Sequence, residues 1–321
     1  MENNTKKKKI ILIDLGTNTA IFSVVELLDN KLIIPYEKSI TTRIGQNIST
    51  NNTISKSSLE RNIQVMGQEL KKIHDLFDIG NIYGMTTEAI RKADNGEECL
   101  KQINNKLNID IEAISGEEEA CYTWLALKHL VKDKTSTVGV CDIGGGSTEL
   151  TIVKDDKIIF MNSFPTGVVR IEEEFHLTSN RTNLNNAISK LDKTFNIQPN
   201  IKAERPKHLF LSGGTATTAA TMLIGAKKYN PIAVEGLKIN ENQLKILIDK
   251  LLNSSKEEIK DMLISDPGRY DVITSGILMI LTIMQKLEPT ETIVTTYGPR
   301  HGYLLKKLNL SHFEEIRYKL K

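Results

Sequence analysis

The same short pattern occurs twice in the sequence, once near the N-terminus and once near the middle. The segment LIDLGTNTAIFSVVE aligns with VCDIGGGSTELTIVK, which pairs Asp14 with Asp142 and Gly16 with Gly144. Each copy has an apolar run, a turn with aspartate and glycine, and a second apolar run, the pattern of two strands joined by a short turn. Repetition at this distance predicts two related domains, each offering one such loop to a shared cleft.

The loop of the second copy has the stronger chemical pattern. Gly144, Gly145 and Gly146 follow Asp142, and Ser147 and Glu149 come next. Glycine weakens strand interiors, so three in a row need a reason such as a tight turn or a ligand close to the backbone. Backbone N–H groups in such a loop bind phosphate, and two carboxylates beside phosphate suit Mg²⁺. A plain hairpin turn explains this segment equally well.

A third glycine motif, LFLSGGTATTAA, predicts a strand, a turn and then a helix of small residues. A glycine turn at a helix N-terminus is an anion site, which would use Gly213, Gly214 and Thr215. Close packing of a small-residue helix on a sheet is the alternative. Further on, Arg269 and Asp271 stand at the head of a long apolar helix, where a surface cap and a buried functional pair are equally plausible.

The segment ISGEEEACYTWLALKHLV predicts a helix with three glutamates in its first turn. The helix dipole favours carboxylates there, which is a sufficient explanation for Glu117 and Glu118. Glu119 receives a separate role below, from a family resemblance.

Composition excludes several classes of protein. The chain of 321 residues is long enough for two domains, and 40% hydrophobic with 26% charged residues is typical of globular proteins. A net charge of +2 does not indicate a nucleic-acid binder. The three cysteines show no metal-binding spacing, and no apolar run has the length of a membrane span. We therefore expect a cytoplasmic protein that binds neither nucleic acid nor membrane.

Seven ordered segments, spread over nearly the whole chain, resemble the Ppx/GppA phosphatase family: IDLGTNT, TTEAIR, ISGEEEA, DIGGGSTEL, SFPTGVVR, LSGGTATT and YGPRHGYLL. That family belongs to the actin, sugar-kinase and chaperone-ATPase superfamily. The resemblance implies an α/β fold with two actin-like (ribonuclease H-like) domains, mixed sheets and an interdomain cleft. The expected domains are 1–124 plus 302–321, and 125–301. It also implies a short form without the HD-like helical domain of longer members.

The resemblance implies a hydrolase that uses Mg²⁺. Its expected substrate is inorganic polyphosphate, from which it would release the terminal phosphate as an exopolyphosphatase. The alternative substrate is guanosine pentaphosphate, from which the enzyme would release the 5′-phosphate. The resemblance also allows a homodimer. Other open alternatives are an ATP-dependent kinase, a filament-forming actin relative and a catalytically weak sensor. Lysines and arginines that could form a basic track for a long polyanion, or equally a solvated surface, are Lys202, Arg205, Lys207, Lys227 and Lys228.

The resemblance also assigns residues. Glu119 matches the family's catalytic glutamate, and Asp142 and Glu149 match acids that serve Mg²⁺ and the attacking water. The residues that match phosphate-binding positions are Asp14, Gly16, Thr17, Asn18, Arg43, Arg91, Gly144, Gly145, Gly146, Ser147, Gly213, Gly214, Thr215 and Arg269. Two departures could reshape the substrate channel: Ala20 replaces a bulky aromatic residue, and Gly298–Arg300 reads Gly-Pro-Arg instead of Gly-Leu-Arg.

Overall fold

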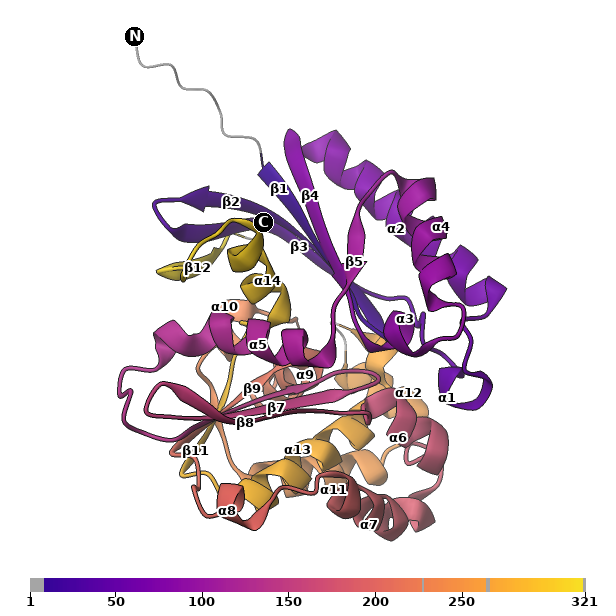
Figure 1. Ribbon diagram of the computed structural model, residues 1–321. Coiled ribbons are helices and arrows are strands. Elements are labelled where there is room, and N and C mark those ends of the chain that lie inside the picture. The colour runs from indigo at the N-terminus through magenta and orange to yellow at the C-terminus, as the bar shows by residue number, and fades with distance from the viewer. Residues whose placement is uncertain (1–8, 227, 264–265, 320–321) are drawn as a thin grey trace. The chain divides into compact units, whose positions relative to one another are not determined.

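The computed structural model describes residues 9–226, 228–263 and 266–319 (Figure 1). The chain forms two compact units: unit 1 comprises Met1–Ser115 with Arg300–Lys321, and unit 2 comprises Gly116–Pro299. The boundaries expected from the sequence, 124 and 301, lie close by. Helix α5 (Gly116–Leu127) belongs wholly to unit 2 because it packs on strands of that unit's sheet.

Unit 1 is built on a six-stranded mixed sheet in the order β12-β3-β2-β1-β4-β5. Strands β1 to β3 form an antiparallel meander, β4 and β5 continue the sheet parallel to β1, and β12 pairs parallel with β3. The strands are β1 (Lys9–Leu15), β2 (Thr19–Leu28), β3 (Lys31–Thr41), β4 (Ile79–Thr86), β5 (Ile111–Ala113) and β12 (Glu315–Tyr318).

Alternation along the strands separates the two faces of this sheet. Ile11 and Ile13 of β1 and Phe22 of β2 are fully buried and join a core with apolar residues of α2 and α4. These two helices contact each other, and Figure 1 shows them side by side. The helices of unit 1 are α1 (Ile48–Asn51), α2 (Lys56–Leu76), α3 (Glu88–Lys92), α4 (Gly96–Leu107) and α14 (Pro299–Lys307), whose first residue is the last of unit 2.

The start of α4 allows a stability prediction. A Cβ atom on Gly96 would lie far inside van der Waals contact with the backbone carbonyl of Ile90, which cannot move aside as a side chain does. We expect Gly96→Ala to cost about 1–3 kcal/mol, the usual range for overpacking. At Gly67 in α2 the nearest atom is a flexible one, Leu107 Cδ2 at 3.2 Å. Because alanine favours helix, Gly67→Ala is expected to leave stability unchanged or raised by up to about 1 kcal/mol.

Urea denaturation of both variants beside the parent protein checks this contrast. An equal loss of unfolding free energy in the two variants would contradict the assignment of the cost to the Ile90 carbonyl.

Unit 2 repeats this sheet arrangement. The strand order is β10-β11-β9-β6-β7-β8, in which β6 to β8 form the antiparallel meander and β9 and β11 continue parallel to β6. Without the outer strands β12 and β10, the two sheets have the same strand order: it is β3-β2-β1-β4-β5 in unit 1 and, read in the opposite direction, β8-β7-β6-β9-β11 in unit 2. The strands are β6 (Val138–Ile143), β7 (Thr148–Lys154), β8 (Lys157–Phe164), β9 (His208–Ser212), β10 (Lys238–Ile239) and β11 (Glu291–Val294).

The core of unit 2 is centred on α13 (Ile273–Leu287), in which nearly every side chain is buried. It packs with α6, α7, α9 and α11. The remaining helices are α6 (Val168–Phe175), α7 (Leu184–Thr194), α8 (Pro199–Lys202), α9 (Gly213–Leu223), α10 (Pro231–Val234), α11 (Glu241–Leu252) and α12 (Lys256–Met262), with short 3-10 turns at Lys128–Leu130, Arg181–Asn183 and Pro267–Arg269. None of the helices within the described ranges is long and apolar enough to cross a membrane.

The turns that open the two meanders have the same geometry. The backbone N–H of Gly16 donates to the carbonyl of Thr19 at 3.0 Å, and that of Gly144 donates to the carbonyl of Ser147 at 3.0 Å. In each turn a glycine Cβ would lie 3.2 Å from that same carbonyl oxygen. The predicted repeat and the α/β fold class with two related domains are therefore confirmed, while the shared cleft stays a prediction.

Candidate active site

In unit 2, two carboxylates meet across neighbouring strands. Asp142 on β6 lies directly opposite Glu149 on β7, so both side chains project from the same face of the sheet. They are 6% and 2% exposed. Ser163, opposite Glu149 on β8, donates its hydroxyl to Glu149 Oε1 at 2.7 Å. Together the two acids raise the pKa of the neighbouring thiol of Cys141, for which burial is the larger cause.

The glycine loop between these two acids is held by the segment that opens α6. Backbone N–H groups of Val168 and Val169 donate to the carbonyls of Gly144 and Gly145 at 3.0 and 2.9 Å. A Cβ on Gly167 would collide with the backbone of the loop, so this approach requires glycine. Because both segments contribute backbone, the loop is a fixed turn in which the carbonyls of Gly144 and Gly145 are already used.

The third glycine motif lies against the first acid. Gly213 has φ +88°, and a Cβ there would lie 2.5 Å from Asp142 Oδ1. The hydroxyl of Thr215 donates to the carbonyl of Ile143 at 3.2 Å. The structure thus brings the start of α9 to the end of β6, as expected for parallel strands β6 and β9.

Arg269 belongs to the same place, since a Cβ on Gly214 would collide with its guanidinium. The side chain is 9% exposed, and its Nε donates to Asp266 Oδ2 at 2.8 Å. The alternative of a surface cap is therefore wrong: Arg269 is a buried cation at the N-terminus of α9.

Glu119 differs from the glutamates beside it. All three are in the first turn of α5, which packs on β6, β7 and β8. Glu117 and Glu118 are exposed, while Glu119 is 7% exposed. The helix therefore buries one carboxylate of the three.

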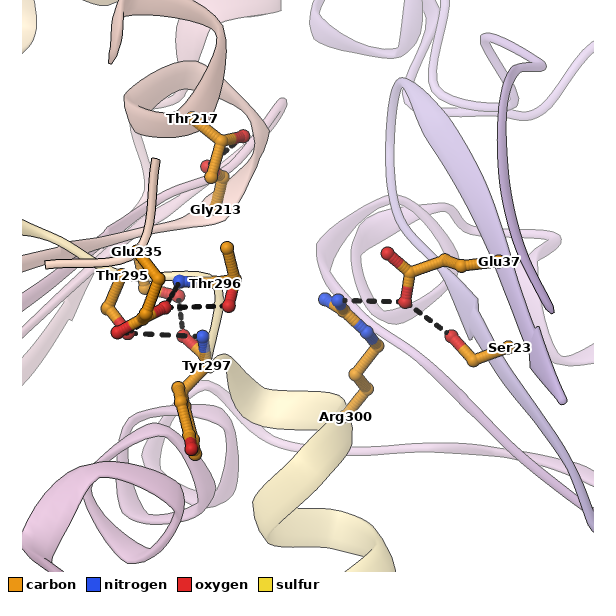
Figure 2. A network of polar contacts seen from close by, with 10 residues as sticks. Ser23, Glu37, Gly213, Thr217, Glu235, Thr295, Thr296, Tyr297 and Arg300 are labelled. Atoms are coloured by element: carbon orange, nitrogen blue, oxygen red, sulfur yellow. Dashed lines mark hydrogen bonds and ion pairs between the residues drawn. The ribbon is translucent and has the colours of Figure 1, made fainter. Parts of the chain in front are cut away.

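Sequence reasoning missed the polar network that supports these residues. Ser212 Oγ lies 2.8 Å from the carbonyl of Tyr297, to which it donates, and 3.3 Å from Asp142 Oδ2. Figure 2 shows the Glu235 carboxylate accepting bonds from Thr295 and Thr296. The bond from Thr296 N is 2.6 Å and that from Thr296 Oγ1 is 2.7 Å. Glu235 therefore fixes the loop whose carbonyl holds Ser212.

In unit 1, the first loop is held by backbone hydrogen bonds from the segment that follows β3. The carbonyl of Asn18 accepts from Thr42 N at 3.0 Å and Arg43 N at 2.9 Å, and the carbonyl of Thr17 accepts from Gly45 N at 3.0 Å. Arg43 itself has φ +53°, the left-handed region. The side-chain Nδ2 of Asn18 is buried and has no hydrogen-bond partner among the described residues. A buried amide donor of this kind fits a loop that receives an acceptor such as phosphate.

Arg91 follows β4, whose end pairs with the end of β1 before the first loop. Its Nη1 donates to the carbonyl of Ile114 at 2.6 Å. The structure therefore places Arg43 in the loop by its backbone and Arg91 at the same edge of the sheet.

Asp14 of this loop is close to two charged residues outside it. Figure 2 shows Glu37 accepting bonds from Ser23, at 2.8 Å, and from Arg300, at 3.3 Å. Burial raises the pKa of Asp14 from 3.8 to about 6; the Arg300 charge lowers it and the Glu37 charge raises it. Opposite Asp14 on β2 is Ile21, where the second copy has Glu149.

Residues of unit 2 fit a magnesium ion better than residues of unit 1. Asp142 and Glu149 supply two hard oxygen ligands on one face, and Mg²⁺ is commonly held by one or two carboxylates together with substrate phosphates and water. Within the described ranges, no cluster of three or more His, Cys, Asp and Glu side chains is arranged as a metal cage. A bound ion would thus share its coordination with the substrate.

Two related α/β domains, each with an aspartate-glycine turn between antiparallel strands, define the actin-like class of phosphate-binding proteins. The model of the Ppx/GppA phosphatase family matches residues 21–311. The chain belongs to this family, whose members are phosphoanhydride hydrolases.

Curated relatives differ in length and in name. A bifunctional 3-dehydroquinate synthase/phosphatase of Fusobacterium nucleatum is 28% identical over 92% of this chain, and exopolyphosphatase 1 of Mycobacterium leprae is 23% identical over 93%. A guanosine-5′-triphosphate,3′-diphosphate pyrophosphatase of Vibrio atlanticus is 26% identical over 95%. The chain spans 46%, 89% and 60% of these three proteins, respectively.

Among solved structures, the PPX-GPPA enzyme of Aquifex aeolicus superposes with a TM-score of 0.73 at 27% identity. The match covers 93% of this chain and 99% of that one. The fold is therefore similar over nearly the whole of both chains.

Proposed function

We propose that the protein is an exopolyphosphatase that releases the terminal phosphate of inorganic polyphosphate with the help of Mg²⁺. The observation that carries this proposal is the match to exopolyphosphatase 1 of M. leprae, which covers 93% of this chain and 89% of that protein. The buried acids of unit 2 and the glycine loops support it, because phosphoanhydride hydrolysis depends mainly on positioning and charge neutralisation.

The residues of unit 2 would divide the work as follows. Glu119 accepts the proton of the attacking water, a role open to a buried carboxylate in its charged form. The N–H groups of Gly145, Gly146 and Ser147 and those of Gly213–Thr215 bind phosphate oxygens, and Arg269 neutralises charge beside Gly214. In unit 1, the loop of Asp14, Gly16, Thr17 and Asn18, with Arg43 and Arg91, would hold further phosphates.

Asp142 and Glu149 would hold the metal. When bound, Mg²⁺ neutralises charge that develops on phosphate oxygens. The hydroxyl of Ser163 donates to Glu149 and so orients that carboxylate, while Ser212 lies 3.3 Å from Asp142 Oδ2.

The competing substrate is guanosine pentaphosphate. The Vibrio relative favours it, but this chain covers only 60% of that protein. The basic track proposed for a long chain is also weakened. Arg205 pairs with Glu288 at 2.7 Å and Lys207 with Asp133 at 3.2 Å, while Lys227 lies outside the described residues. We therefore propose short polyphosphate chains as the better substrate.

A cytoplasmic location is part of the proposal. Cys99, Cys121 and Cys141 form no disulfide within the described chain, as is usual in a reducing compartment.

The test is phosphate release from tripolyphosphate, long-chain polyphosphate, guanosine pentaphosphate and ATP side by side, with Mg²⁺ and with EDTA. We expect release from polyphosphate that EDTA abolishes, fastest on short chains. Faster release from guanosine pentaphosphate would transfer the assignment to that substrate. Transfer from ATP to an acceptor, or no release at all, would contradict the proposal.

A further inference from the structure

A buried charged cluster lies on the face of the unit 1 sheet opposite its apolar core. Leu12 pairs with Ser23 and Ser23 pairs with Glu37, so with a period of two Asp14 projects from the same face as Ser23 and Glu37. Arg300 in the first turn of α14 reaches this face and binds Glu37. The Arg300 and Glu37 side chains are only 10% and 9% exposed.

The cluster contains two carboxylates and one guanidinium. Ser23 and Arg300 both donate to Oε2 of Glu37, so this carboxylate is fixed by two bonds. The residues opposite Asp14 on the neighbouring strands are Ile21 and Met85, which carry no charge. The charges that face Asp14 in the described cluster are therefore Arg300 from α14 and Glu37 from β3.

These two residues are not among those assigned to the first loop. Arg300 and Glu37 are 263 positions apart, and neither touches the backbone bonds that close the loop. Both reach the sheet face from which Asp14 projects, and their charges act on its pKa in opposite directions: Arg300 lowers it and Glu37 raises it.

We propose that Arg300 and Glu37 are positioning residues that control the protonation of Asp14 and thereby the strength with which the first loop binds a polyanion. Glu37 anchors the guanidinium, and the guanidinium favours the charged form of the Asp14 carboxyl. Without that cation, the pKa of Asp14 would be higher.

The consequence for binding rests on the proposed function. A phosphate chain beside Asp14 repels its charged form and favours its neutral form, so binding takes up a proton. Since the pKa of Asp14 is about 6, the carboxyl is mostly charged above pH 6 and mostly neutral below it. Affinity for a polyanion therefore rises as the pH falls through 6.

The direct test requires no substrate. The full chain is labelled with ¹³C at aspartate carboxyl groups, and the Asp14 resonance is assigned from its absence in Asp14→Asn. The titration midpoint of this resonance is then measured between about pH 4 and 8, a range that brackets the raised pKa of Asp14. Glu37→Gln keeps an oxygen for Ser23 and Arg300 but removes a negative charge, so the midpoint should fall. Arg300→Gln removes the positive charge, so the midpoint should rise.

Two further variants separate charge from structure. Arg300→Lys keeps the cation and should leave the midpoint close to that of the parent, even if the fold is less stable. Lys307 is on the same helix and pairs with Glu112 at 2.8 Å, away from the cluster. Lys307→Gln removes one positive charge from α14 and should not move the midpoint.

Opposite shifts of about one pH unit in Glu37→Gln and Arg300→Gln would support the proposal, this being the usual effect of one close charge. Equal midpoints in all variants, or shifts in the same direction, would overturn it. If Arg300→Gln does not fold, the proposal is decided by the other two variants: it requires a lower Asp14 midpoint in Glu37→Gln and an unchanged midpoint in Arg300→Lys.

The binding consequence is tested by calorimetry with tripolyphosphate and Glu119→Gln protein, in two buffers of different ionisation enthalpy. The proton uptake of the ligand itself is common to all variants. We expect fewer protons to be taken up on binding near pH 6 when the protein carries Asp14→Asn in addition to Glu119→Gln. Unchanged uptake would overturn the link to binding, whereas absence of hydrolytic activity in the parent protein would overturn only the proposed function.

Discussion

Glu119→Gln is expected to lower kcat on polyphosphate by about 10²–10⁴-fold, the usual contribution of a general base. Glutamine has nearly the shape of glutamate but cannot accept the proton of water. Because Glu119 is 7% exposed in the first turn of α5, the substitution keeps its packing while removing one charge. KM should therefore change little, which initial-rate kinetics on tripolyphosphate would measure.

The control for this prediction is Glu117, which lies in the same first turn of α5. Glu117→Gln removes an equal charge from the same dipole end, but its side chain is exposed. It should retain the activity of the parent. Equal losses in the two variants would assign the effect to helix electrostatics instead of proton transfer, and an unchanged rate in Glu119→Gln would remove Glu119 from the mechanism.

The second large effect is expected at Gly213. An alanine there would adopt φ +88° with difficulty, and its Cβ would lie 2.5 Å from Asp142 Oδ1. To relieve that contact the carboxylate must move, and a displacement of about 1 Å at a reacting centre can cost 10²-fold in rate. We expect Gly213→Ala to lower kcat/KM by about 10²-fold and to require more Mg²⁺ for half-maximal rate.

Gly236→Ala separates the contact from the backbone strain. Gly236 has φ +75°, so alanine pays a comparable left-handed penalty of about 1–2 kcal/mol there, but no atom lies within 4 Å of its Cβ position. Both variants should lose similar thermal stability. Only Gly213→Ala should show the changed Mg²⁺ dependence, and a similar change in Gly236→Ala would mean that the strain itself disturbs the site.

The general fold was predictable because it is written twice in the chain. The turns at Gly16 and Gly144 bond in the same way, and the strands on either side have matching apolar runs. Apolar runs and glycine turns of this kind can be recognised in the sequence of any chain that forms such a meander. The sorting of the three glutamates was also predictable in part: dipole capping explains Glu117 and Glu118, and the structure buries the third.

The supporting residues were not predictable from local sequence. Ser163 reaches Glu149 through strand register, which a polar serine near a strand end does not reveal. Glu235 reaches Thr296 over 61 positions, and Arg300 reaches Glu37 over 263. Such pairs depend on how elements pack, and sequence periodicity gives no information about that. Register counted from the β7–β8 turn would have placed Asn162 opposite Glu149, because a shift between Ile152 and Val153 moves the pairing by one residue.

The difference between Ile21 and Glu149 has an evolutionary consequence. Two copies of one ancestral turn would at first carry the same side chains and hence the same chemistry. In this chain the backbone of the turn is retained in both copies, while the cross-strand acid is present in only one of them. Under the proposed function, a duplication followed by loss or gain of this single carboxylate would be enough to give the two turns different roles, with the metal held by one and phosphate bound by the other.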